Sequence, residues 1–268
     1  MTTADPSVSP RRRRSRRTLV LIILALFLLP IAARAGLYAY QGGSGSWRTA
    51  DWSSIGSLPA AKDHPEARLL VLSGRTGGLK GAVAVHSWVV VKAANATTWR
   101  RYDVVGWGTP VRENMRAPDG RWYGDHPSVI ADIKGDEAEK LIPKIDAAIK
   151  AYSFANDGDY RLWPGPNSNT FVATVLRAVP EVGVTMPPNA IGRDYRPGPY
   201  AGLTDSGTGL ELNLYGVLGL KVAWVEGFEL NIGGFVAGLD VRNPAVKIPG
   251  FGRIGFDGMS ATAMPVPK

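Results

Sequence analysis

Two side chains far apart in the chain could together perform nucleophilic chemistry. Ser168 follows a Pro-Gly-Pro turn and stands at the predicted start of a helix, where free backbone N–H groups can hold an oxyanion. A serine hydroxyl gains little from the helix dipole alone, so it needs a positioned base, and His86 on a predicted strand is the candidate. Asp103 on the next predicted strand could orient the imidazole. These three residues suggest a hydrolase or acyltransferase acting on a peptide, an amide or a lipid ester.

The same region also has a purely structural interpretation. The run Asn-Ser-Asn-Thr at 167–170 is typical of any well-capped helix start, and a single strand histidine is often a core residue bonded to a carbonyl. These residues would then build a ligand groove in a non-catalytic binding or structural protein. We favour this hypothesis because no third catalytic residue is evident and the chain has no Cys. The groove candidates are Trp88, Trp163, Asn167 and Asn169.

Composition argues against several other kinds of site. The 268 residues include no Cys and 3 His, without the spacing of a zinc site or a phosphate-binding loop, so we expect no metal and no cofactor. The net charge of +8 is local, because residues 1–35 hold seven Arg and one Asp. The rest of the chain is close to neutral, and we therefore expect no nucleic-acid partner.

The N-terminal region predicts membrane insertion or export. Basic residues precede an uncharged run from Thr18 to Ala33, and by the positive-inside rule they hold this end in the cytoplasm. A span needs about 20 apolar residues, and continuation to Tyr40 supplies them. The triplet Ala33-Arg34-Ala35 also fits a signal-peptidase site, so export with cleavage is the alternative. We favour a single-pass anchor in the inner (cytoplasmic) membrane, with the C-terminal domain outside the cytoplasm.

The elements that position the candidate residues follow from periodicity. Three β-rich runs at 68–73, 81–92 and 99–107 predict adjacent antiparallel strands, and alternation on the second places His86 and Trp88 on the same face. A short strand is expected at 160–163. Helical spacing predicts one helix with Asp136 as N-cap, and a second helix with Asn167 as N-cap that ends at Pro180.

The predicted fold class is α+β, with an antiparallel sheet, two packed helices and a β-rich C-terminal extension. Glycine-punctuated strands dominate after residue 201, and charged residues such as Glu211, Lys221 and Glu229 favour an antiparallel meander over a second membrane span. We expect residues 41–268 to be soluble; otherwise 210–239 is the stretch that associates with lipid. The predicted parts are a basic tail (1–17), an anchor or signal (18–40), a linker (41–66), the α+β core (67–200) and the extension (201–268).

Several sequence blocks make the chain similar to the bacterial envelope family catalogued as Domain of Unknown Function 3750. The most specific block is Trp-Pro-Gly-Pro-Asn-Ser-Asn-Thr-Phe-Val at 163–172, supported by His-Ser-Trp-Val-Val-Val-Lys at 86–92 and Ala-Ile-Gly-Arg-Asp-Tyr at 190–195. The resemblance extends over about 69–255. It implies a place in the cell envelope and brings no established activity.

A weaker resemblance is to circularly permuted papain-like proteins, including the lecithin-retinol acyltransferase group. In those proteins a strand histidine precedes a nucleophilic cysteine at a helix start, as His86 here precedes the block at 167–172, with Ser168 at the cysteine position. The resemblance implies a permuted papain-like core that either uses serine or has lost the chemistry. The expected partners are the membrane, through residues 18–40, and a peptide, glycan or lipid of the envelope.

Overall fold

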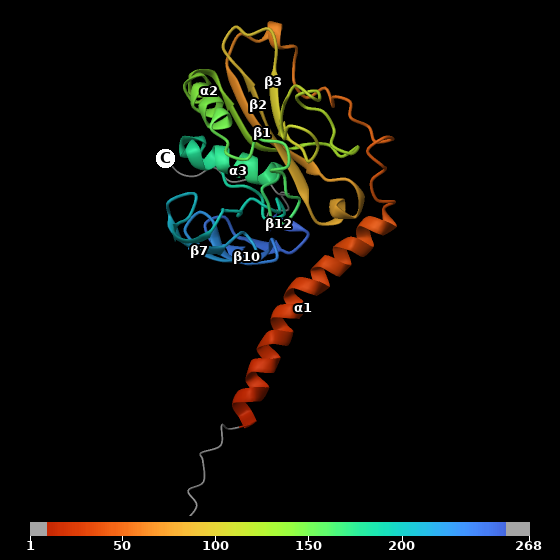
Figure 1. Cartoon of the computed structure of the whole chain (residues 1–268), viewed down its shortest axis with the longest axis vertical. Helices are drawn as coiled ribbons and strands as arrows, with labels where there is room; N and C mark the ends of the chain where they lie inside the picture. The colour runs from red at the N-terminus through yellow and green to blue at the C-terminus, as the bar shows by residue number, and fades with distance from the viewer. Residues whose placement is uncertain (1–9, 256–268) are drawn as a thin grey trace, which may run out of the picture.

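The computed structural model describes residues 10–255 (Figure 1). A long helix, α1 (Pro10–Tyr40), runs away from a globular part built of two antiparallel sheets and two helices, α2 (Gly135–Lys150) and α3 (Ser168–Ala178). Within α1, Arg16–Tyr40 is long and apolar enough to cross a bilayer. The predicted α+β class with an N-terminal apolar helix is confirmed. Of the predicted C-terminal extension, residues 256–268 lie outside the described part of the chain.

The first sheet has five strands in the order β4-β3-β2-β1-β5, with every neighbouring pair antiparallel. Its strands are β1 (Arg68–Arg75), β2 (Val85–Lys92), β3 (Arg100–Val104), β4 (Val111–Glu113) and β5 (Ser128–Lys134). The first three match the predicted strands and their adjacency. β5, which the sequence pattern did not predict, pairs with the free edge of β1.

The two faces of this sheet carry different layers. One face carries the main hydrophobic core, in which α3 packs on β2 and α2 packs on β1 and β5. Val85, Val89 and Val91 of β2 belong to this core. The other face carries a smaller aromatic cluster that includes Trp88 and Trp122. Alternation along β2 therefore places odd-numbered residues toward the helices and even-numbered residues away from them.

The helices form where their apolar stripes were predicted, but their starts differ. In α2 the buried residues recur at helical spacing: Ala138, Leu141, Ile142, Ile145 and Ile149. Its N-cap is Lys134, so the predicted capping by Asp136 is wrong: Asp136 lies inside the first turn, where a carboxylate still complements the helix dipole. In α3 the N-cap is Asn167, as predicted.

Two other segments differ from a simple sequence interpretation. Residues 160–163 are irregular, with a bend at 162–163, and do not form the predicted strand. The Arg161 N–H donates to the Pro166 carbonyl and closes the segment on itself. Much of the segment at 41–66 is irregular, and it docks on the loop that carries Asp119. Its Ser54 hydroxyl and Ser57 N–H donate to the Asp119 carboxylate over 2.5 and 2.7 Å.

The second sheet is a seven-stranded meander in the order β12-β11-β10-β9-β8-β7-β6. Its strands are β6 (Pro199–Leu203), β7 (Gly209–Leu214), β8 (Leu218–Ala223), β9 (Gly227–Ile232), β10 (Phe235–Asp240), β11 (Ala245–Ile248) and β12 (Gly252–Gly255). The antiparallel meander predicted for this region is confirmed. In Figure 1 this sheet forms the lower end of the globule, below α3.

Candidate functional site

His86 lies in a buried polar network on the face of the five-stranded sheet that carries no helix. Its imidazole stacks on the Trp122 indole, with ring centroids 3.6 Å apart and planes inclined by 6°. His86 Nε2 lies 2.9 Å from Asp103 Oδ1, so the structure brings together these two of the three predicted catalytic residues. Both side chains come from neighbouring strands and are almost inaccessible to solvent.

Arg101 completes the network and fixes its protonation states. Its guanidinium donates to both Asp103 oxygens, over 2.7 and 2.9 Å, and lies 4.1 Å from the centroid of Trp88. Burial would raise the pKa of the Asp103 carboxyl, but Arg101 and the hydrogen bond from His86 hold it below its usual value. Burial lowers the pKa of His86, although Asp103 opposes the shift. A neutral imidazole that donates from Nε2 to an ionised carboxylate follows.

Ser168 belongs to a different layer of the molecule. It is buried in the first turn of α3, the helix that packs on the opposite face of β2 from the His86 network. Among the hydrogen bonds of residues 10–255, none joins the Ser168 hydroxyl to His86. The structure thus brings His86 to Asp103 and leaves Ser168 in the helix layer.

The side-chain amides of Asn167 and Asn169, on either side of Ser168, donate hydrogen bonds to backbone carbonyls. Asn167 caps the helix through its side-chain oxygen, and its amide donates to the Leu162 and Ile191 carbonyls. Asn169 donates to Val85 and Ile191 carbonyls over 2.8 and 2.9 Å. These contacts join the start of α3 to β2 and to the segment at 191, which is a structural role.

The two predicted groove tryptophans have different surroundings in the fold. Trp88 is fully buried, and its indole N–H donates to the Pro118 carbonyl over 3.0 Å. Trp163 is 53% exposed, and its indole donates to the Gly233 carbonyl of the seven-stranded sheet. The four groove candidates therefore do not line one common surface.

A separate aromatic pocket lies above the His86 network. It is an open cavity of about 480 Å³, whose floor is the Trp122 ring that stacks on His86. Trp52 meets Trp122 edge to face at 5.1 Å, so these two rings of the lining pack against one another. The lining residues are Trp47, Trp52, Trp107, Met115, Arg116, Trp122 and Tyr123.

Arg116 is the single charged residue of this lining. Its guanidinium lies 4.2 Å from the centroid of Trp52, in cation–π contact. Its Nε is buried and has no hydrogen-bond partner within residues 10–255, and the ion pairs of that part of the chain do not include it. A buried donor without an acceptor costs free energy, which a ligand oxygen could offset. The pocket suits an apolar body that carries an anionic group.

Comparison with family models identifies the central part of the chain. Residues 66–195 match the family described as "Protein of unknown function (DUF3750)". This part of the chain belongs to that family. The DUF3750 region holds the five-stranded sheet, α2 and α3, and ends before the seven-stranded meander, so the match is shorter than the resemblance at 69–255. Searches of curated proteins and of solved structures gave no match, and the papain-like resemblance stays a prediction.

The pocket residues were missed because they are scattered along the sequence. Trp47 and Trp52 precede the DUF3750 region, whereas Trp107, Arg116 and Trp122 lie in loops within it. The available signal was the presence of several Trp in irregular chain, where burial in a core is not expected. For metals, residues 10–255 contain no cluster of three or more His, Asp or Glu that could hold an ion.

Proposed function

We propose that the chain is a membrane-tethered, non-catalytic binding protein whose globular part lies outside the cytoplasm. Its ligand would be a molecule that has an apolar or cyclic group and an anionic group, as lipids, aromatic acids and acidic glycans of the envelope do. The observation that carries this proposal is the aromatic pocket with the unpaired Arg116. Apolar lining with a few convergent polar groups is the usual character of small-molecule sites.

The tether is supported by the way in which α1 joins the globule. Its last turns carry Arg34, whose guanidinium lies 5.9 Å from the ring centroid of Phe251, and Tyr38, which is buried. Cleavage after Ala35 would remove Arg34 from this contact. The packing therefore favours an uncleaved anchor over a signal peptide, and the Arg-rich flank favours an exported C-terminal side.

The positions of His86 and Ser168 support a non-catalytic role. The imidazole of His86 is sandwiched against Trp122 and bonded to Asp103, whereas Ser168 belongs to the helix layer on the other face of β2. A general base must reach its nucleophile directly or through one water. We therefore assign the His86 network to holding the pocket floor.

Ligand binding is tested with two naphthalene probes that differ in charge. Naphthalene sulfonate and naphthyl methanol are titrated by calorimetry into the full chain and into Arg116→Met. The matched control is Arg48→Met, because Arg48 also contacts a pocket tryptophan, the exposed Trp47, but does not line the pocket itself. A charge-assisted hydrogen bond is worth about 1.5–3 kcal/mol, so Arg116→Met should weaken sulfonate binding by about ten- to a hundred-fold. Naphthyl methanol should bind both variants alike.

Two results would contradict this proposal. Equal sulfonate affinity in wild type and Arg116→Met would remove the pocket as an anion site. Labelling of the wild type by a fluorophosphonate, abolished in Ser168→Ala, would support a serine hydrolase instead.

A further inference from the structure

The seven-stranded sheet is inverted relative to an ordinary surface sheet. Along β7, the leucines Leu210, Leu212 and Leu214 are exposed, whereas Glu211 and Asn213 are buried. The same alternation continues through β8 and β9, where charged residues face inward and apolar residues face outward. A solvated sheet normally shows the opposite arrangement.

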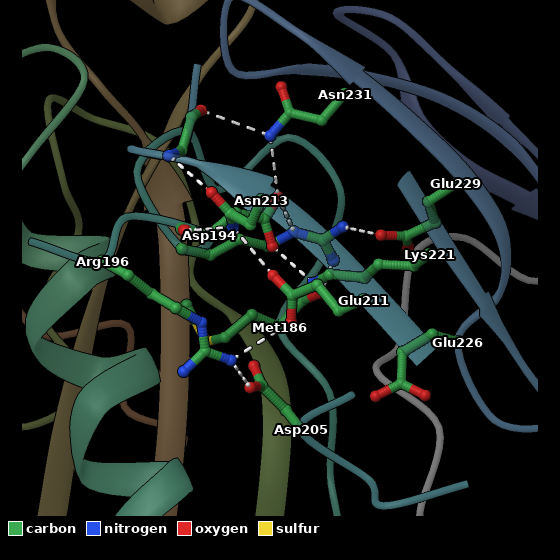
Figure 2. A network of polar contacts seen from close by, with 12 residues as sticks. Met186, Asp194, Arg196, Asp205, Glu211, Asn213, Lys221, Glu226, Glu229 and Asn231 are labelled. Atoms are coloured by element: carbon green, nitrogen blue, oxygen red, sulfur yellow. Dashed lines mark hydrogen bonds and ion pairs between the residues drawn. The ribbon is translucent and has the colours of Figure 1, made fainter. Parts of the chain in front are cut away.

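The inner face is a row of charges that neutralise one another. Cross-strand pairing aligns Glu211 with Lys221 and Lys221 with Glu229, and the row continues through Gly238 to Lys247. Asp194, on the segment that covers this face, accepts a hydrogen bond from Lys221 over 2.5 Å. Figure 2 shows Asp194, Glu211, Lys221 and Glu229 close together in a network of dashed contacts. The charged groups are therefore satisfied inside the protein and leave the outer face free of charge.

The outer face is a continuous apolar surface. One cross-strand row runs without interruption from β6 to β12 through Leu203, Leu210, Val222, Phe228, Leu239, Val246 and Ile254. Seven strands about 4.8 Å apart and about 20 Å long cover on the order of 600 Å². The largest apolar patch of a typical soluble monomer is about 300–600 Å², and such a patch often serves a function. The outer face of this sheet is at the upper end of that range.

We propose that this outer face lies on the lipid bilayer in which α1 is anchored. The inference rests on the proposed tether and adds a second, monotopic contact. α1 does not leave the globule at a single point: it contacts β10, and Phe27, Ile31, Arg34 and Tyr38 form a helical stripe with reduced exposure. Phe27, in the middle of the apolar run, is 5% exposed. The protein thus remains beside α1 at the depth of its apolar segment.

The orientation and the rim of the sheet fit this placement. In Figure 1 the sheet forms the end of the globule toward which α1 runs. Tyr215 and Trp224 stand in the turns at opposite ends of β8 and are half exposed, as aromatic side chains at a membrane interface are. Contact with the bilayer also accounts for the position of α1 beside β10, because the membrane-spanning helix and the apolar face then meet the same membrane.

Because the chain has no Cys, single cysteines can report the depth of chosen positions. The full chain is reconstituted into vesicles of phosphatidylcholine and phosphatidylglycerol, with an environment-sensitive fluorophore at Val222→Cys on the outer face. Leu24→Cys in α1 is the reference for lipid, and Lys140→Cys on the exposed side of α2 is the reference for water. Quenching is measured with nitroxide-labelled lipids and with aqueous iodide.

We expect the Val222 label to resemble the Leu24 label, with strong lipid quenching and iodide quenching several-fold below that of Lys140. A Val222 label that iodide reaches, with Leu24 still in lipid, overturns the inference and leaves the tether intact. Protection from both quenchers also overturns it, because a second copy or another protein segment would then cover the face. Iodide access to Leu24 itself overturns the tether together with this inference.

A second variant tests whether the apolar row holds the sheet on lipid. Leu210 and Phe228 flank Val222 and are 67% and 45% exposed, so the double variant Leu210→Glu/Phe228→Glu should still fold. The Val222 label should then become accessible to iodide while the Leu24 label stays in lipid. Lys140→Glu, which adds a carboxylate on α2, should change neither. Persistent lipid quenching at Val222 in the double variant would contradict the view that this apolar row holds the sheet on lipid.

Discussion

The inner charge row predicts a large stability loss when one carboxylate is neutralised without a change of shape. Glu229 is 2% exposed and accepts hydrogen bonds from Arg193 and Lys247, the latter over 2.5 Å. In Glu229→Gln, Arg193 keeps its neighbour Asp194 3.5 Å away, but Lys247 keeps only the Glu226 carbonyl. A buried cation without a counter-charge remains, which costs about 3–5 kcal/mol of unfolding free energy.

The matched control is an exposed pair of the same chemistry. Lys144 donates to Glu181 over 2.6 Å, with side chains that are 54% and 50% exposed. Solvent screens such pairs, so Glu181→Gln should cost no more than about 1 kcal/mol. Whole domains unfold with about 5–15 kcal/mol, so both variants should remain folded enough to measure.

The assay is urea unfolding of the full chain in detergent, followed by tryptophan fluorescence. With a urea slope of about 3 kcal/mol/M, Glu229→Gln should lower the midpoint by at least about 1 M. Removing the orphaned cation as well, in Glu229→Gln/Lys247→Met, should recover about 1–3 kcal/mol. A loss in Glu229→Gln no larger than that of Glu181→Gln would refute the view that this row is a desolvated charge network.

Three further predictions concern topology, pH and a close backbone contact. Alkaline phosphatase fused after Lys268 should be active, and an intact but inactive fusion would reverse the proposed orientation. Burial lowers the pKa of His86, so below about pH 6.5 the unfolded chain binds a proton that the folded chain does not. The free energy of unfolding should therefore decrease as the pH is lowered below this value. At about pH 5.5 the loss should reach at most about 1.4 kcal/mol in urea unfolding and vanish in His86→Gln, and a pH-independent difference between the two proteins would contradict it. Gly192→Ala should destabilise the protein by about 1–3 kcal/mol, because φ at this position is +98° and an added Cβ would overlap the side-chain amide of Asn167. An unchanged thermal midpoint would contradict this prediction.

The sequence pattern predicted most of the secondary structure but not the relation between its layers. Strand β2 is buried along its whole length on both faces. Alternation could therefore pair His86 with Trp88, which the structure confirms, but could not tell which face α3 covers. The aromatic pocket was invisible for a similar reason. Trp52 and Trp122 are 70 residues apart in the sequence and meet only because the segment at 51–58 docks on Asp119.

In the C-terminal meander the strands were predicted correctly, but the prediction did not say which side chains point into the protein. Glu211, Lys221 and Glu229 interrupt the apolar runs, which argues against a second membrane span. Period-two alternation is symmetric, however, and does not say which set of residues points inward. The sign of the charges carries that information: neighbours in the register alternate between acidic and basic, so the row can be buried as ion pairs. When the polar set neutralises itself in this way, the apolar set is left on the outer face, the face that we propose lies on lipid.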